Sequence, residues 1–227
     1  MTTDRARLVA TAFTSVILPM ALLTALTIGL GFLVTHVLVH VWPFTVEDEA
    51  VRALVAARTA TGDRVSNWVS LVAYRAALAI VVVVAGCAMR IAYHRWREPL
   101  FLPAALVSQG LVYLVTSPVV ARARPAVLQL DSFPPMRSFP SGHVAAAVAV
   151  YGGLALILAQ RARGRGQAAA WWIVLLIVPM AVGISRMYRG EHHASDVAAS
   201  FLVGFACLWI WRRAILTPAA PQGSREP

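Results

Sequence analysis

Polar residues that can hold and cleave a phosphate ester gather in three short segments of an otherwise apolar chain. The first is Arg122-Ala-Arg124-Pro125, the second is Ser138–His143, and the third comprises Ser185-Arg186 and Glu191–Asp196. Arginine binds phosphate through a bidentate fork, and a histidine oriented by a carboxylate can act as a nucleophile. Two histidines, a carboxylate and several arginines together indicate phosphoryl transfer through a histidine.

The second segment also predicts the start of a helix. Pro140-Ser141-Gly142 precedes a long apolar run, which places Ser141 at or beside the N-cap. The unpaired N–H groups of a first helical turn form an anion site, and Gly142 allows close approach of a ligand to the backbone. His192 and Asp196 are four residues apart and therefore share one helix face. A carboxylate there can fix the tautomer of the imidazole, and His143 supplies a second imidazole.

The three segments resemble the motifs of the type 2 phosphatidic acid phosphatase superfamily, which comprises membrane lipid phosphatases and haloperoxidases. The signature of that superfamily is Lys-x6-Arg-Pro, then Pro-Ser-Gly-His, then Ser-Arg-x5-His-x3-Asp. The chain has Arg124-Pro125, then Pro140–His143, then Ser185-Arg186 followed by His192 and Asp196, in the same order. The second and third motifs are complete.

The resemblance implies a role for each matching residue. His192 would attack phosphorus to form a phosphohistidine, His143 would protonate the leaving oxygen, and Asp196 would orient His192. The phosphoryl oxygens would be held by Arg124, Ser141, Gly142 and Arg186. The resemblance also implies that no metal or other cofactor takes part.

The chain departs from the signature at Ser117, where the superfamily has its lysine. All twenty basic residues of the chain are arginines. A charge-assisted hydrogen bond is worth about 1.5–3 kcal/mol, so its loss would slow the reaction by roughly 10–100-fold. Arg122 and Arg75 are the two candidates to compensate. Arg75 falls inside a predicted span, where an arginine either serves a site or extends to the interface.

The composition indicates a membrane protein. The 227 residues are 59% hydrophobic and 13% charged, whereas a soluble domain is roughly 45–50% apolar and about 25% charged. This hydrophobicity excludes intrinsic disorder, and two cysteines are too few for a disulfide scaffold. The net charge of +10 fits loops that flank a membrane better than a nucleic-acid surface.

Six apolar stretches are long enough to cross a bilayer as helices. They are Leu8–Val41, Trp68–Met89, Leu100–Ala121, Val144–Gln160, Ala169–Ile184 and Val197–Ile215. They predict an all-α integral membrane protein with six transmembrane helices in a bundle. The first stretch is too long for a signal peptide, and one helix kinked at Pro19 is favoured over a hairpin around Gly29–Gly31. Between the first two spans, Pro43–Asn67 predicts an amphipathic helix on the membrane surface.

The distribution of arginine suggests the orientation. With the N-terminus in the cytoplasm, eleven arginines lie on the inner side and nine on the outer side, a small positive-inside bias. Arg161-Ala-Arg163-Gly-Arg165 is the clearest inner loop. All three polar segments then face outward, as a site on the extracytoplasmic side of the cell membrane. Residues 1–216 are predicted to form one domain with a catalytic core at about 100–216, and 217–227 a disordered tail.

These observations predict a membrane phosphatase that hydrolyses a lipid phosphate or diphosphate, with the bilayer and the lipid as its partners and no nucleic acid. Polyprenyl diphosphate is favoured, while phosphatidic acid and phosphatidylglycerol phosphate also fit. Two alternatives remain open: a catalytically silent lipid-phosphate-binding protein, because of Ser117, and a phosphotransferase to an acceptor other than water. His192, His193 and Asp196 together are a further candidate, for zinc.

Overall fold

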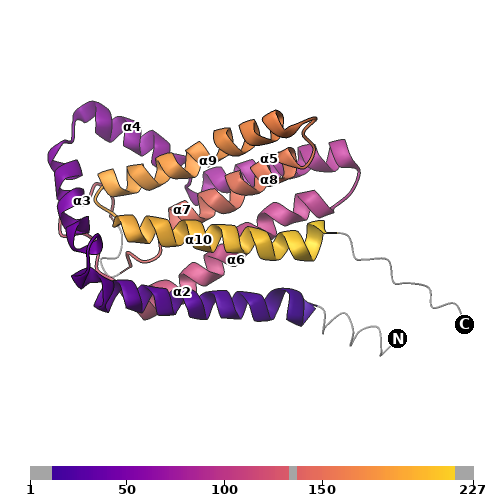
Figure 1. Cartoon of the computed structure of the whole chain (residues 1–227). Helices are drawn as coiled ribbons and strands as arrows, with labels where there is room; N and C mark the ends of the chain where they lie inside the picture. Colours follow the sequence, from indigo (N-terminus) through magenta and orange to yellow (C-terminus); the bar gives the residue numbers. More distant parts are fainter. Residues whose placement is uncertain (1–11, 133–136, 218–227) are drawn as a thin grey trace, which may run out of the picture.

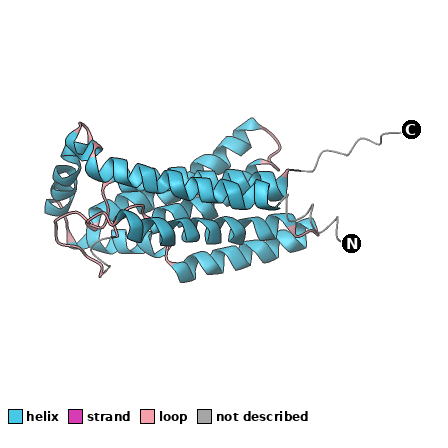
Figure 2. Cartoon of the chain, turned by 90° about the horizontal axis from the view of Figure 1, so that it is seen from below, coloured by secondary structure: helices cyan, strands magenta, loops and turns pink. Residues whose placement is uncertain are grey.

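The computed structural model describes residues 12–132 and 137–217, and six of its helical segments are long and apolar enough to cross a membrane. They are Phe13–His40, Arg75–Tyr93, Arg97–Val120, Gly142–Ala159, Arg165–Tyr188 and Ala194–Leu216. The segments lie side by side in one elongated bundle (Figures 1 and 2). The predicted all-α bundle of six spans is therefore confirmed.

The bundle is built from α-helices joined by short 3-10 and π segments. In chain order, the elements are η1 (Phe13–Ile17), α2 (Leu18–His36), η2 (Leu38–His40), η3 (Phe44–Val46), α3 (Glu47–Ala56), α4 (Ala60–Leu71), α5 (Arg75–Tyr93), α6 (Arg97–Val120), α7 (Gly142–Ala147), η4 (Val148–Gly152), α8 (Gly153–Ala159), α9 (Arg165–Tyr188), α10 (Ala194–Trp211) and η5 (Arg212–Leu216).

The first span is one helix, as the sequence favours. Gly29 and Gly31 lie inside α2, and Pro19 lies in the first turn of α2, directly after the π-helical segment η1. Proline has no N–H to donate, and the helix continues through it from Phe13 with a π-helical turn before it. Residues 8–11 of the predicted span lie outside the described part of the chain, as does the predicted tail beyond Thr217.

The predicted second span, Trp68–Met89, is wrong at its start. The chain leaves helix α4 after Leu71 and begins α5 at Arg75, although apolar residues continue across the break. In the last turn of α4, the Ser70 hydroxyl lies 2.8 Å from the hydroxyl of Ser185 on α9, so α4 packs against α9 where it ends. Arg75 therefore marks the beginning of the span and not its interior.

The predicted surface helix between the first two spans is two helices, α3 and α4. Both lie at the end of the bundle opposite the chain termini (Figure 1). The acidic first turn of α3 is not fully solvated as an amphipathic surface helix would require, because Glu47 is only 9% exposed. It packs instead against the beginning of α10, where its carboxylate accepts a hydrogen bond from the backbone N–H of Ser195 at 2.6 Å.

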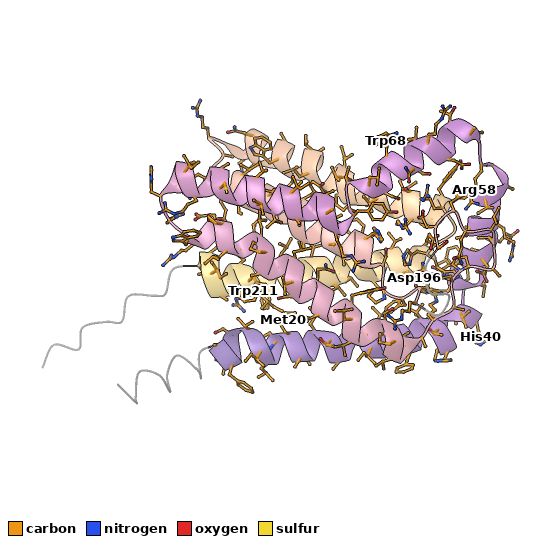
Figure 3. All side chains as sticks on the ribbon, turned by 180° about the vertical axis from the view of Figure 1, so that it is seen from behind. Met20, His40, Arg58, Trp68, Asp196 and Trp211 are labelled. Atoms are coloured by element: carbon orange, nitrogen blue, oxygen red, sulfur yellow. The ribbon has the colours of Figure 1, made fainter. Side chains whose placement is uncertain are left out.

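The segment Gly142–Ala159 is the most buried of the six spans and lies at the centre of the bundle. Glycines let its neighbours approach closely, since a Cβ atom added at Gly204 of α10 would lie 2.6 Å from Val148. Successive spans run in opposite directions, so the end of α6 and the beginnings of α7 and α10 share one end of the bundle. Figure 3 shows Asp196 at this end with His40, and Met20 and Trp211 toward the other.

Candidate active site

One cavity of about 580 Å³ brings together residues of all three polar segments. Arg124 lines it from the segment that joins α6 to α7, and His143 lines it from the first turn of α7. Arg186 lines it from the end of α9, and His192 from the loop before α10. Gly142 also contributes to the wall. Residues more than sixty positions apart in the sequence therefore meet around one space, as the alternating direction of the spans predicts.

The structure defines the tautomer of His192. Its Nδ1 atom lies 2.7 Å from the backbone carbonyl oxygen of Ser138. A carbonyl oxygen can only accept a hydrogen bond, so Nδ1 carries the proton and the lone pair is on Nε2. Burial lowers the pKa of His192 to about 4, which keeps the imidazole neutral at neutral pH. His192 is therefore in the state that a nitrogen nucleophile requires.

Asp196 acts on His192 less directly than the sequence predicts. Its Oδ2 atom is 3.8 Å from Nδ1 of His192, which is too long for a hydrogen bond. The same oxygen accepts hydrogen bonds from the Ser138 hydroxyl and from the backbone N–H of His193, the latter at 2.8 Å. The carboxylate thus fixes Ser138, whose carbonyl group holds His192.

Two carboxylates, those of the buried Glu191 and the partly exposed Asp131, hold two of the arginines that line the cavity. Arg124 donates to the backbone carbonyl oxygen of Glu191 at 2.6 Å and to the carboxylate of Glu191 at 3.0 Å. Arg186, which is fully buried, donates to Asp131 at 2.8 Å. Burial raises the pKa of Glu191, an effect that Arg186 and Arg124 oppose. These contacts fix both guanidinium groups in place before any substrate arrives, which favours tight binding of an anion.

The beginning of α7 forms another part of the wall. Ser141 is its N-cap residue, as predicted, but the Ser141 hydroxyl is buried, has no hydrogen-bond partner among the described residues and does not line the cavity. Its N–H donates to the Ser200 hydroxyl at 2.7 Å. Gly142 faces the ring of Tyr113, where a Cβ atom would approach to 3.3 Å. The ring of His143 packs edge-on against Tyr74, with the centroids 5.2 Å apart.

Arg122, a predicted substitute for the missing lysine, does not line the cavity. Its guanidinium donates to Asp196 at 2.6 Å, to the Ser195 hydroxyl at 2.7 Å and to Glu47 at 3.0 Å. Its backbone carbonyl also accepts the N–H of Ser138 at 3.1 Å. Arg122 therefore supports the residues behind His192, and the expectation that it reaches the substrate phosphate is not met.

Ser117 and Arg75, the other two positions connected with the missing lysine, differ in whether they line the cavity. Ser117 is fully buried in α6 and does not line the cavity, so no cation takes the place of the lysine there. Arg75, at the first position of α5, is exposed and does line the cavity. Arg137, which the sequence does not single out, lines it as well.

Most of the remaining wall of the cavity is apolar, with Gln109, Tyr74 and Tyr113 as its polar members. The apolar part is formed by Leu78 and Ala146 together with Leu106, Val107, Gly110 and Leu114 of α6. Val107 is 59% exposed and Leu114 is 60% exposed. Both lie on the outer surface of the bundle, where a membrane would surround the spans. The charged end of the cavity therefore continues into a hydrocarbon-like surface between α5 and α6.

Four residues that shape the site carry no role in the sequence analysis: Glu47, Asp131, Ser138 and Glu191. The sequence does contain a signal for Glu191. This glutamate directly precedes a motif histidine, and a carboxylate buried there would need arginines as partners because an unpaired buried charge is costly. Ser138 had none, since its backbone carbonyl holds His192 and every residue has a carbonyl. Glu47 is separated from Arg122 by 75 positions, a distance over which sequence patterns show no contacts.

Within residues 12–132 and 137–217, no group of three or more His, Cys, Asp or Glu side chains is arranged to hold a metal ion. His193 contacts the carboxylates of Asp48, at 3.0 Å, and Asp196, at 3.2 Å. Its ring therefore joins α3 to α10, and His192 points instead toward Ser138.

Comparison with known proteins finds relatives of this chain. The sequence profile of the PAP2 superfamily matches residues 98–218. Phosphatidylglycerophosphatase B of Bacillus subtilis is 26% identical over 186 residues, which cover 80% of this chain and 89% of that protein. The probable diacylglycerol pyrophosphate phosphatase 1 of Schizosaccharomyces pombe is 37% identical over 87 residues, which cover 36% of this chain and 31% of that protein.

Solved structures show the same arrangement of helices. The crystal structure of a transmembrane PAP2 type phosphatidylglycerolphosphate phosphatase from Bacillus subtilis superposes with a TM-score of 0.72 at 25% identity, covering 83% of this chain and 94% of that chain. Aquifex aeolicus LpxE superposes with a TM-score of 0.59 at 22% identity, covering 76% of this chain and 98% of that chain. At that identity LpxE supports the fold alone.

Proposed function

This chain belongs to the PAP2 superfamily, and on that premise we propose that it is an integral-membrane phosphatase that hydrolyses a lipid phosphate or diphosphate. One observation carries the proposal: His192, whose Nδ1 is bound to a carbonyl group, lines a single cavity with His143 and two buried arginines, and the rest of the cavity wall is mostly apolar. The charged end suits a phosphate, and the apolar wall suits the chain of a lipid.

The mechanism we propose is a double displacement. Nε2 of His192 attacks phosphorus, the bond from phosphorus to the lipid oxygen breaks, and His143 protonates that oxygen. Arg124 and Arg186 stabilise the charge on the equatorial oxygens. Water then attacks the phosphohistidine with His143 as the base, the N–P bond breaks, and inorganic phosphate leaves. The carboxylate of Asp196 offsets the positive charge of the phosphorylated imidazole.

The relatives support a glycerolipid substrate over the polyprenyl diphosphate that the sequence favours. Their names specify diacylglycerol pyrophosphate and phosphatidylglycerophosphate. We propose that the acyl chains of such a lipid leave the cavity between α5 and α6, past Val107 and Leu114, and remain in the bilayer during hydrolysis.

The activity is tested with the purified protein in mixed micelles that contain EDTA. Diacylglycerol diphosphate, phosphatidylglycerol phosphate, phosphatidic acid and farnesyl diphosphate are supplied separately, and released inorganic phosphate is measured. We expect release from at least one glycerolipid at a rate that EDTA does not change, since the proposed steps use only side chains. Binding without release would support the catalytically silent alternative, and transfer to an added alcohol without release would support a phosphotransferase.

We further propose that the cavity faces the extracytoplasmic side, because the opposite end of the bundle carries Arg161 and Arg163 in the loop before α9 and Arg165 at the start of α9. The test uses the full chain in intact cells, with Cys87→Ser to remove the exposed native thiol. A membrane-impermeant maleimide is expected to label Arg52→Cys on α3 but to label Arg163→Cys only after the cells are opened. The reverse labelling would place the site in the cytoplasm.

A further inference from the structure

Two arginines of the cavity are not neutralised by any carboxylate in the described part of the chain. Arg124 and Arg186 are paired with Glu191 and Asp131, whereas no hydrogen bond or ion pair involves the guanidinium of Arg75 or Arg137 within residues 12–132 and 137–217. Both side chains are exposed and both line the cavity. The cavity therefore holds two cations more than its own anions require.

From this we propose that Arg75, together with Arg137, binds a second phosphate group located between the scissile phosphate and the lipid chain, and so selects lipid diphosphates over lipid monophosphates. The proposal rests on the proposed phosphatase function and adds to it the class of headgroup. A terminal phosphate on an ester carries about −1.5 to −2 charges at pH 7, and a diphosphate carries more. The two additional cations match this larger charge.

The position of Arg75 indicates which phosphate it meets. Arg75 directly follows Tyr74, whose ring packs against His143. His143 is the proposed donor of a proton to the leaving oxygen, so the first turn of α5 lies on the side of the leaving group. In a diphosphate the leaving group is itself a phosphate, which places its charge beside Arg75.

The helix end supports the same arrangement. Tyr74 makes no side-chain cap at the start of α5, and the uncapped N–H groups of a first turn attract an anion. Arg137 lines the same cavity, and its carbonyl group accepts a hydrogen bond from Arg124 at 3.2 Å. A phosphate between the two arginines would thus lie next to the one held by Arg124 and Arg186.

A lipid diphosphate would be hydrolysed by the same two steps. Nε2 of His192 attacks the terminal phosphorus, and the bond from that phosphorus to the bridging oxygen breaks. His143 protonates the bridging oxygen, which remains on the lipid monophosphate. Water then releases the terminal phosphate from His192. Arg75 stabilises the charge that develops on the leaving phosphate, an interaction that a lipid monophosphate cannot use because its leaving group is a neutral alcohol.

The test compares two substrates with the same acyl chains, diacylglycerol diphosphate and phosphatidic acid. We expect Arg75→Gln to lower kcat/KM for the diphosphate by about 10–100-fold, the value of one charge-assisted hydrogen bond, and to lower it much less for the monophosphate. Arg75→Lys keeps the charge and should retain most of the preference. Arg52→Gln, on the exposed side of α3, is the matched control and should leave the preference unchanged.

A binding measurement separates this proposal from the phosphatase function. Thermal stabilisation of the protein by inorganic pyrophosphate and by orthophosphate is measured for the wild type and for Arg75→Gln. Even if no lipid is hydrolysed, stronger stabilisation by pyrophosphate that Arg75→Gln removes would support the second phosphate site. An equal loss with both substrates and both anions would overturn the proposal and make Arg75 a replacement for the missing lysine. No change in either measurement would also overturn it.

Discussion

Replacing His192 with alanine is expected to lower kcat for phosphate release by about 10⁴-fold or more, the scale seen when an enzyme loses its nucleophile. The reason is geometric, because the carbonyl oxygen of Ser138 fixes the proton on Nδ1 and leaves Nε2 as the nucleophilic atom. The measurement is release of inorganic phosphate from the best substrate of the lipid panel. His36→Ala, an exposed histidine at the end of α2, is the control and should keep full activity.

The same variant tests the covalent intermediate. Wild-type protein mixed with lipid labelled in its terminal phosphate and quenched in alkali, where phosphohistidine survives, should retain label on the protein. His192→Ala should retain none. Wild-type activity in His192→Ala, or label that persists in it, would show that another residue attacks phosphorus.

Arg122→Gln is expected to produce the second largest effect, through a residue that does not line the cavity. It removes the cation shared by the buried carboxylates of Glu47 and Asp196, and breaking a buried ion pair from one side costs about 3–5 kcal/mol of stability. Asp196 and Ser138 then lose their support, so we expect kcat to fall by about 10–100-fold. Thermal unfolding and steady-state kinetics measure the two effects.

The kinetic parameters distinguish positioning from phosphate binding. If Arg122 acts only through Asp196 and Ser138, kcat falls while KM changes little. A rise in KM as large as the loss in kcat would instead mean that Arg122 contacts the substrate. Should Arg122→Gln not fold, Arg122→Lys preserves the charge and allows the same comparison, with Arg52→Gln as the control on α3.

A double-mutant cycle between Arg122 and Glu47 extends this test. The two residues lie 3.0 Å apart in different parts of the chain, and contacting residues of a buried network couple by about 0.5–3 kcal/mol. Adding Glu47→Gln to Arg122→Gln should therefore cost less than the sum of the two single changes. Strict additivity would show that Glu47 of α3 and Arg122, which follows α6, do not support one another.

The sequence by itself predicts the six spans and the polar residues that meet at one end of them. Six apolar stretches predict the six spans, because a helix that crosses hydrocarbon must be apolar over its whole length. The spacing of Arg124, His143, Arg186 and His192 relative to those spans places all four at the same end of the bundle, since each span reverses the direction of the chain. These features depend only on residue type and on position along the chain, so they can be predicted from the sequence.

The tertiary structure decides which atoms meet. It places Arg75 at the beginning of α5, because the chain leaves α4 after Leu71, where Ser70 contacts Ser185 of α9. It pairs Nδ1 of His192 with the backbone carbonyl group of Ser138. The sequence cannot predict this pair, because every residue type has a backbone carbonyl. The tertiary structure also pairs Arg122 with Glu47 and Asp196, because the energy of an ion pair depends on distance and burial, which only the packed helices fix. The sequence therefore determines which groups the site contains, and the packing of the helices determines which of these groups contact one another.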